Sequence, residues 1–362
     1  MDVKGWCAAL CMLLALAGPA AHAQGFAGMG QAVEGFATPD PDDRLTFPAD
    51  HGPHPDFRIE WWYLTATLTG PDGTDYGAQW TLFRTALRPG EAAGFASPQL
   101  WMGHAALTSA ETHVFAEKLG RGGVGQAGVT PAPFKAWIDD WQMISRAAPG
   151  ADALSALDLN ASGSGFSYAL ALQAEGPLVA QGNLGYSVKS AAGQASHYYS
   201  QPFYTVTGTI NLGDQDIPVT GQAWLDREWS SQPLAPDQTG WDWFSLIFDD
   251  GARLMGFRLR DAGTGYLSAT WIDADGTPTP MPPGALRLTP LETASVAGRT
   301  VPVRWRVELP QKSVDVTVTA LNPQAFMQTT VPYWEGPIRF TGSHAGRGYL
   351  EMTGYAAPLR LS

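Results

Sequence analysis

Residues 199–224 read YSQPFYTVTGTINLGDQDIPVTGQAW, and residues 333–356 read YWEGPIRFTGSHAGRGYLEMTGYA. Both stretches contain a tyrosine, a proline and a Thr-Gly pair, followed by a second Thr-Gly pair twelve or thirteen residues further on. A looser similarity relates residues 60–84 to residues 241–260, since each holds a tryptophan-containing aromatic pair, an Asp-Gly turn and a run that ends in arginine. Self-similarity of this kind predicts two related structural units in tandem.

The sequence around these stretches is typical of β structure. Short runs rich in Thr, Tyr, Trp, Val and Phe are separated by turn signals such as Pro71-Asp-Gly73, a pattern that predicts an all-β sandwich or barrel. Residues 133–144 are ambiguous: Trp137 and Trp141 are four apart, as on an amphipathic helix, but a strand fits equally well. We expect the boundary between the two units within residues 232–240.

The N-terminus has the features of a secretory signal peptide. They are a positive charge, an apolar run and a small-x-small cleavage site, found at Lys4, residues 6–17 and Ala21-His22-Ala23. We therefore expect residues 1–23 to be removed, a mature start near Gln24, a flexible lead-in over residues 24–43, and a periplasmic or secreted location. Both cysteines fall within the signal, so the mature chain is expected to have no disulfide and no thiol nucleophile.

Composition narrows the class of partner. The net charge of −12 argues against nucleic acids and anionic membrane surfaces as partners. No run after the signal approaches the roughly 18 apolar residues of a membrane span. Aromatic residues make up 11% of the chain, and 14 of them are tryptophans, which predicts either an aromatic cavity for an apolar small molecule or an aromatic β core.

Residues 221–230, GQAWLDREWS, place three consecutive charges between tryptophans. Strand alternation puts Trp224, Asp226 and Glu228 on one face and Arg227 on the other. Asp226 and Arg227 therefore cannot neutralise each other. Either Asp226 meets an arginine or backbone amides across the sheet and is structural, or it faces an aromatic cavity, where desolvation would make it a proton donor.

Other candidates lie on neighbouring segments. In SHYYSQP (196–202), His197 and Tyr199 share one strand face and are expected beside Trp224 and Asp226. Glu60 needs a cation if buried, from Arg84, Arg227 or Arg258. We expect Glu60, Arg227 and Glu228 to form structural ion pairs. Candidates for substrate binding are the aromatic residues Trp62, Tyr63 and Trp243.

Several familiar chemistries lack a signature. His51, His54 and Asp56 have no further ligand at a diagnostic spacing, so no metal is expected. A G-x-S-x-G elbow and a Gly-rich phosphate loop are absent from the sequence, and no cofactor is expected. Glycoside hydrolysis by Asp226 and Glu228 stays formally open, although the aromatic surroundings suit an apolar substrate better.

Six motifs in order resemble the AttH-like branch of the carotenoid hydratase superfamily: HPDFRIEWWYLTATL, SHYYSQP, GQAWLDREWSSQPL, GWDWFSL, YWEGPI and GRGYLEMTGY. The resemblance spans about residues 44–360. It implies two tandem lipocalin-like β-barrel domains, over residues 44–235 and 236–362. Members that are carotenoid 1,2-hydratases add water to an alkene without a cofactor, and related fungal proteins catalyse Diels–Alder cyclisations.

The resemblance also implies roles for particular residues. The family's acid falls on Asp226 and its histidine on His197, while Trp224 stands where the family has tyrosine and Tyr199 where it has tryptophan. The expected function is an exported, cofactor-free hydratase or lyase for an isoprenoid or lipid-like alkene. A carrier of a hydrophobic ligand and a polyene cyclase are the alternatives.

Overall fold

The structure is a computed structural model that describes residues 34–213, 215–232, 234–235 and 237–355. The expected signal peptide lies outside these residues. In the described ranges the only helical segments are three 3-10 turns, at Ala49–His51, Gly94–Ala96 and Pro310–Lys312. None of the described residues forms a helix long and apolar enough to cross a membrane.

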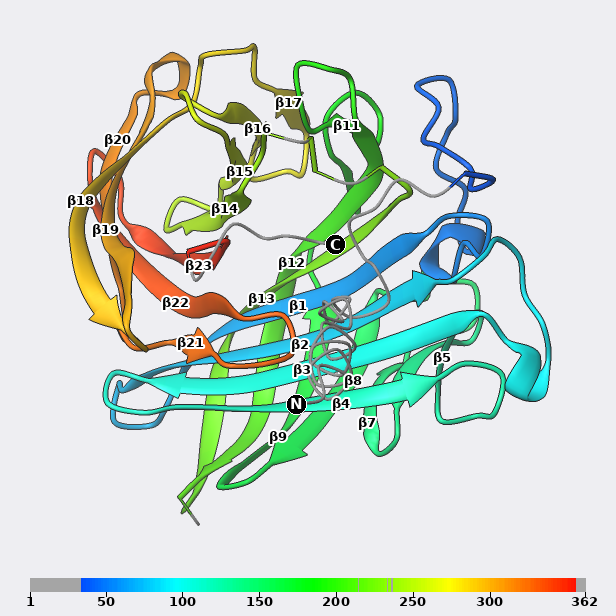
Figure 1. Cartoon of the computed structure of the whole chain (residues 1–362). Coiled ribbons are helices and arrows are strands. Elements are labelled where there is room, and N and C mark those ends of the chain that lie inside the picture. The colour runs from blue at the N-terminus through cyan, green and yellow to red at the C-terminus, as the bar shows by residue number, and fades with distance from the viewer. Residues whose placement is uncertain (1–33, 214, 233, 236, 356–362) are drawn as a thin grey trace, which may run out of the picture.

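Strands of the described chain form two antiparallel sheets, one of 13 strands and one of 10 (Figure 1). The first contains β1 (Ile59–Thr69), β2 (Asp75–Ala86), β3 (Gln99–Ser109), β4 (His113–Arg121), β5 (Ala127–Pro131), β6 (Phe134–Ile138), β7 (Trp141–Ser145), β8 (Ala156–Gly163), β9 (Phe166–Ala174), β10 (Val179–Ala180), β11 (Tyr186–Val188), β12 (Ala195–Leu212) and β13 (Gln215–Ser230). The second contains β14 (Gly240–Phe248), β15 (Arg253–Arg260), β16 (Tyr266–Ile272), β17 (Pro278–Pro280), β18 (Arg287–Val296), β19 (Arg299–Leu309), β20 (Val314–Ala320), β21 (Phe326–Met327), β22 (Tyr333–Gly342) and β23 (Gly346–Thr353).

In each sheet the first strand of the unit pairs with its last strand. The order β2-β1-β13-β12 in the first sheet is matched by β15-β14-β23-β22 in the second. The repeated segments of the sequence are these four hairpins. The all-β prediction of two tandem lipocalin-like units is thus confirmed, with the sheets curled into a near-barrel and a half-barrel.

The ambiguous residues 133–144 are strands. Positions 134–138 form β6 and positions 141–145 form β7, with Ile138 paired to Trp141 across a tight turn. Asp139 adopts a left-handed backbone with φ of 51°, which aspartate tolerates better than most residues. Two tryptophans four apart therefore mark the two sides of a hairpin rather than one face of a helix.

A buried acid held by two arginines recurs in both units. Glu60 on β1 lies 3.0 Å from Arg84 and 3.2 Å from Arg227. Asp242 on β14 lies 2.8 Å from Arg258 and 2.5 Å from Arg260. Since each acid pairs in register with the first of its arginines, on the next strand, the two acids are equivalent positions of the repeat.

The equivalence of Glu60 and Asp242 also aligns β13, the last strand of the first unit, with β23, the last strand of the second. Counting from the Thr-Gly pairs gives Leu359 as the counterpart of Asp226, and Leu359 lies outside the described residues. Counting from the clamped acids instead makes Glu351 the counterpart of Glu228, and Tyr349 that of Asp226. By either count Asp226 has no acidic counterpart in the second unit.

The core has three parts. Each sheet encloses its own cluster of apolar side chains, and a third cluster lies where the sheets meet, with Tyr63, Trp224 and Trp243 among its members. Hydrogen bonds also join the sheets, for example from the Tyr63 hydroxyl to Glu335 at 2.8 Å. The second sheet therefore buries the part of the outer face of the first sheet that lies around β1, β12 and β13.

Candidate functional site

The two faces of β13 carry different chemistry. Leu225, Arg227 and Trp229 point into the first unit, while Trp224, Asp226 and Glu228 point toward the second. The alternation predicted from the sequence therefore describes the strand correctly. Asp226 faces a cavity between the sheets.

The cavity has a volume of about 180 Å³. Its walls come from β1, β2, β3, β12 and β13 of the first sheet, from β14, β15, β22 and β23 of the second, and from loops. Aromatic side chains that line it are Trp61, Tyr63, Phe83, Tyr198, Trp241, Trp243, Phe257 and Tyr333. Ionisable side chains that line it, besides those tyrosines, are His104, Lys189, Asp226, Glu228 and Glu351.

Three neutral hydrogen-bond donors hold Asp226. Ser200 Oγ and Trp224 Nε1 donate to Oδ1 at 2.5 and 2.6 Å. The Tyr198 hydroxyl donates to Oδ2 at 2.8 Å, and its oxygen accepts a bond from Trp243 Nε1 at 3.1 Å. Asp226 is only 5% exposed, and none of the ion pairs found among the described residues includes it.

Burial determines the protonation of this carboxyl. It raises the pKa of Asp226 from 3.8 to about 7, and the Glu228 carboxylate adds to the rise. The hydrogen bonds from Ser200, Trp224 and Tyr198 lower the pKa but do not offset the burial. Asp226 is therefore a largely protonated acid just below neutral pH, which is the state a general acid requires.

Asp226 belongs to a row of polar residues across six neighbouring strands. The register pairs Ser200 with Asp226, Asp226 with Tyr63, Tyr63 with Thr81, Thr81 with His104, and His104 with Glu117. Strands lie about 4.8 Å apart, so the backbones of Asp226 and His104 are about 14 Å apart. Asp226, Tyr63 and His104 of this row line the cavity, so Asp226 and His104 stand on separate parts of its wall.

At the far end of the row stands a hydrogen-bonded chain of Tyr333, His104 and Glu117. Tyr333 Oη lies 2.9 Å from His104 Nδ1, and His104 Nε2 lies 3.0 Å from Glu117 Oε1. Burial lowers the pKa of His104, while hydrogen bonds from His104 and Thr330 lower that of Glu117 despite its partial burial. An ionised carboxylate only accepts, so Nε2 carries the ring proton and Nδ1 accepts the Tyr333 O–H.

Two further acids lie close to Asp226. Glu335 accepts the bond from Tyr63, and burial and the nearby Glu351 raise the pKa of Glu335 well above 4.5. Burial raises the pKa of the half-buried Glu351 to about 7, with a further contribution from Glu228 and Asp226. Glu228 itself forms an ion pair with Lys189 Nζ at 2.7 Å. The cavity wall thus combines two acids with raised pKa values, Asp226 and Glu351, with the ion pair of Glu228 and Lys189.

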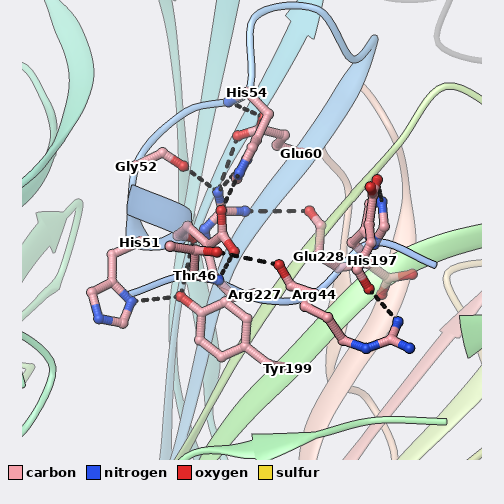
Figure 2. A network of polar contacts seen from close by, with 12 residues as sticks. Arg44, Thr46, His51, Gly52, His54, Glu60, His197, Tyr199, Arg227 and Glu228 are labelled. Atoms are coloured by element: carbon pink, nitrogen blue, oxygen red, sulfur yellow. Dashed lines mark hydrogen bonds and ion pairs between the residues drawn. The ribbon is translucent and has the colours of Figure 1, made fainter. Parts of the chain in front are cut away.

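The opposite face of the same strands carries a separate polar network, which Figure 2 shows around Arg227. The Arg227 guanidinium stacks over the Trp62 ring at 3.8 Å and pairs with Glu60. His51 Nδ1 lies 2.8 Å from the Tyr199 hydroxyl. Arg84 and Arg227, the ion-pair partners of Glu60, lower the pKa of Glu60 to about 2 against the effect of burial. This network fastens residues 44–58 to the first unit.

The structure separates the residues that the sequence placed together. Asp226 and Trp224 are hydrogen-bonded, and Tyr63 and Trp243 line the same cavity with their rings 5.3 Å apart. By contrast His197, Tyr199 and Trp62 lie on the opposite face of the sheet.

The reason for this separation is the register between strands. His197 pairs with Trp229 and Tyr199 with Arg227, and paired residues share a face. His197 accordingly approaches Asp43 at 3.4 Å. The pairing partners of Glu228 and Asp226 are Tyr198 and Ser200. The expected grouping of His197 and Tyr199 with Asp226 is therefore wrong by one residue along β12.

Sequence reasoning missed Tyr198, Ser200, His104, Tyr333 and Glu351. Tyr198 and Ser200 belong to the motif SHYYSQP, but the sequence does not show which alternate residues of that strand share a face with Asp226. The other three come from β3, β22 and β23, and nothing local marks them. No group of His, Cys, Asp or Glu among the described residues could hold a metal ion, and His54 instead pairs with Asp50 at 3.1 Å.

Comparisons with known proteins agree with this fold. A family profile described as AttH-like matches residues 38–355. The crystal structure of a Nitrosomonas europaea protein described as AttH is 36% identical, with a TM-score of 0.78, over 88% of this chain and 100% of that one. A search of curated proteins finds no match.

Two more distant structures share the fold alone. Kievitone hydratase from Nectria haematococca is 17% identical with a TM-score of 0.63, over 89% of this chain and 98% of its own. CghA, solved with Sch210972, is 14% identical with a TM-score of 0.53, over 89% and 97%. The profile match over most of the length and the 36% identical relative show that the chain belongs to the AttH-like family.

Proposed function

We propose that the protein is a hydratase or lyase-type enzyme that adds water to an apolar, isoprenoid or lipid-like alkene in the cavity between its two sheets. One observation carries the proposal: a buried acid, Asp226, lines an aromatic cavity and is held only by neutral donors. The similarity of fold to kievitone hydratase is in keeping with this chemistry. Export, inferred from the N-terminal sequence, belongs to the same proposal.

Asp226 supplies the proton. Its Oδ1 accepts bonds from two groups, Ser200 and Trp224, so in the neutral acid the proton resides on Oδ2. Transfer to one alkene carbon breaks the Oδ2–H bond and leaves a carboxylate and a carbocation. The donors already in place, including Tyr198, then stabilise the carboxylate without reorganisation.

The aromatic walls stabilise the cation. Ring faces attract positive charge most strongly in a desolvated site, and Tyr63 and Trp243 line the cavity close to Asp226. The volume of about 180 Å³ is below the roughly 300–1,000 Å³ typical of sites that enclose drug-sized ligands. A small alkene, or one end of a longer one, is therefore the expected substrate.

The hydrogen-bonded chain of Tyr333, His104 and Glu117 activates the water. As the water oxygen bonds to the cation beside Asp226, its proton passes along further water molecules in the cavity to Tyr333 Oη, while the Tyr333 proton passes to His104 Nδ1. The resulting imidazolium is paired with Glu117. Return of that proton to Asp226 through solvent restores the starting state, so atoms and charge balance.

The test compares the reaction catalysed by the wild type with that of Asp226→Asn. The wild type is incubated with geraniol and with linalool in H₂¹⁸O, and ligands that co-purify with wild type and variant are analysed by mass spectrometry. We expect the wild type to yield a product heavier by one labelled water, and the variant to retain unreacted alkene. The matched control Asp216→Asn, an exposed position on the same strand, should behave as wild type.

The same experiment distinguishes the proposed enzyme from a carrier. Recovery of one unmodified ligand from both the wild type and Asp226→Asn, without ¹⁸O in any product, would contradict the proposed reaction. Circular dichroism of the variant establishes that its fold is intact. Loss of turnover in His104→Gln, with the Asp226 pKa unchanged, would assign water activation to the second end of the cavity.

A further inference from the structure

One wall of the cavity between the sheets already holds a positive charge. Lys189 Nζ lies 2.7 Å from Glu228 Oε1. The same nitrogen lies 4.8 Å from the Tyr198 ring centroid and 4.5 Å from that of Phe257. An ammonium group is thus bound by a carboxylate and two ring faces, a combination that proteins use to recognise organic cations.

The rest of the cavity contains a second set of carboxyl groups and aromatic rings. Asp226 and Glu351 both line it, and in the described ranges neither forms an ion pair with a lysine or arginine. Three tryptophans line the cavity as well: Trp61, Trp241 and Trp243. Two carboxyl groups and several indole rings therefore line the cavity, and neither carboxyl has a cationic partner among the described residues, since Lys189 is paired with Glu228.

We infer that this cavity binds a small organic cation, an alkylated ammonium, with Asp226 and Glu351 as its counter-ions and the indole rings around its alkyl groups. A metal ion would need a shell of oxygen or nitrogen ligands, whereas these walls are largely aromatic. A primary amine would lose more hydration than an alkylated one, whose methyl groups gain from contact with the rings. The volume of about 180 Å³ suits a ligand of the size of choline.

The inference rests on the cavity of the proposed function but does not require its reaction. An alkylated ammonium has the charge and about the size of the tertiary carbocation that protonation of a branched alkene would create. If the proposed function is right, such a ligand is also an inhibitor, because it resembles the high-energy intermediate. If the protein performs another reaction or none, the ammonium still binds.

Proton release is the signature that separates this binding from simple hydrophobic uptake. Burial raises the pKa values of Asp226 and Glu351 to about 7. The charged and titratable groups that face them are Glu228, Lys189, Tyr63, Tyr198 and Glu335. A bound cation favours the carboxylates, so binding near neutral pH must displace protons, and affinity must rise with pH.

Isothermal titration calorimetry of the full chain with choline, and with its neutral isostere 3,3-dimethyl-1-butanol, tests the inference. We expect choline to bind roughly tenfold or more tightly near pH 8 than near pH 5. Near pH 7 its heat should vary with the ionisation enthalpy of the buffer, as proton release requires. The neutral isostere should bind at least about tenfold more weakly than choline near pH 8. Equal affinities, a flat pH dependence or no detectable choline binding would overturn the inference.

A variant locates the site. Glu351→Gln removes one counter-ion and should reduce choline affinity and the number of protons released, while Glu292→Gln, an exposed acid of the second sheet, should change neither. Unchanged choline binding in Glu351→Gln would place the ligand elsewhere and overturn the assignment. The outcome is independent of the alkene assay: choline can fail to bind while Asp226→Asn abolishes hydration, and the reverse is equally distinguishable.

Discussion

At the scale of single residues, the hydrogen bonds around Asp226 determine how firmly it holds its proton. The bond from Tyr198 lowers the pKa of Asp226, because it stabilises the carboxylate. We expect Tyr198→Phe to raise that pKa above about 7 and to slow proton donation, since the conjugate base loses a donor. Carbon-13 NMR titration of labelled aspartate measures the shift, and a lowered pKa in this variant would contradict the assignment.

Glu228 acts on Asp226 in the opposite direction. Its carboxylate raises the pKa of Asp226 by like-charge repulsion. We therefore expect Glu228→Gln to lower the pKa of Asp226, and the freed Lys189 to add to that effect. Asp216→Asn, which removes an exposed charge from the same strand, should leave the pKa of Asp226 unchanged; an equal shift in both variants would mean that the effect is general rather than local.

The sequence identified Asp226 but not its partners, and the reason is the geometry of strands. Alternation within β13 is fixed by the backbone, so Trp224, Asp226 and Glu228 were correctly placed on one face. Which face β12 presents depends on how it registers with β13, and a slip of one residue exchanges Tyr198 for Tyr199. Nothing within either segment determines that register.

At the scale of elements, the pair of arginines around Glu60 connects β1, β2 and β13. Removing the carboxylate leaves two buried guanidinium groups without a counter-ion, so we expect Glu60→Gln to lower the free energy of unfolding by about 3–5 kcal/mol. Urea denaturation measures it. Glu292→Gln breaks a pair whose side chains are 43% and 59% exposed and should cost less than about 1 kcal/mol. Similar losses in the two variants would contradict a structural role for the Glu60 cluster.

The hairpins of the repeat were predictable, whereas their exact alignment was not. Asp-Gly turns occur in both units because both must turn tightly between strands, while the Thr-Gly pairs lie within or at the ends of the paired strands β12, β13, β22 and β23. Their recurrence revealed the tandem fold. The clamped acids Glu60 and Asp242 give a different alignment, since the ion pairs of Glu60 connect β1, β2 and β13 and those of Asp242 connect β14 and β15. That relation appears only when Arg227 and Arg260 are seen beside these acids.

At the scale of the whole molecule, the raised pKa values of two buried acids make a contribution to stability that is larger at acid pH. In the folded state Asp226 and Glu351 have pKa values of about 7, above their unfolded values. Between about pH 4 and 7 these two carboxyls bind more protons in the folded chain than in the unfolded chain, so their contribution to the free energy of unfolding falls as pH rises through that window and levels off above it. Burial lowers the pKa values of His104 and His113, so these histidines contribute stability that is lost as pH falls below about 6.5. Glu60, with its pKa lowered to about 2, contributes stability that is lost as pH falls below about 4.5.

We therefore expect the stability of the wild type, relative to that of Asp226→Asn, to be greater near pH 5 than near pH 8 by about 2–3 kcal/mol. The asparagine is neutral at both pH values, so this difference isolates the contribution of Asp226, while the contribution of the buried histidines is common to both proteins. Urea denaturation of the two proteins at both pH values measures it. The same pH dependence of stability in the two proteins would contradict the protonated state of Asp226.

The cavity itself is a property of the assembled molecule. Tyr333 and Glu351 reach it from the second sheet, and His104 and Asp226 from the first. No segment contains more than a part of it, so sequence patterns could indicate an aromatic, acid-bearing protein but not the space in which these groups meet.

The central claim is that Asp226 keeps its proton up to about neutral pH, and titration of that one carboxyl tests it most directly. In protein labelled with carbon-13 at the aspartate side chains, the Asp226 signal is assigned by its loss in Asp226→Asn and followed with pH. The structure predicts a pKa of about 7. A value near 4, the ordinary range of aspartate, would make Asp226 a carboxylate at neutral pH and contradict its role as proton donor.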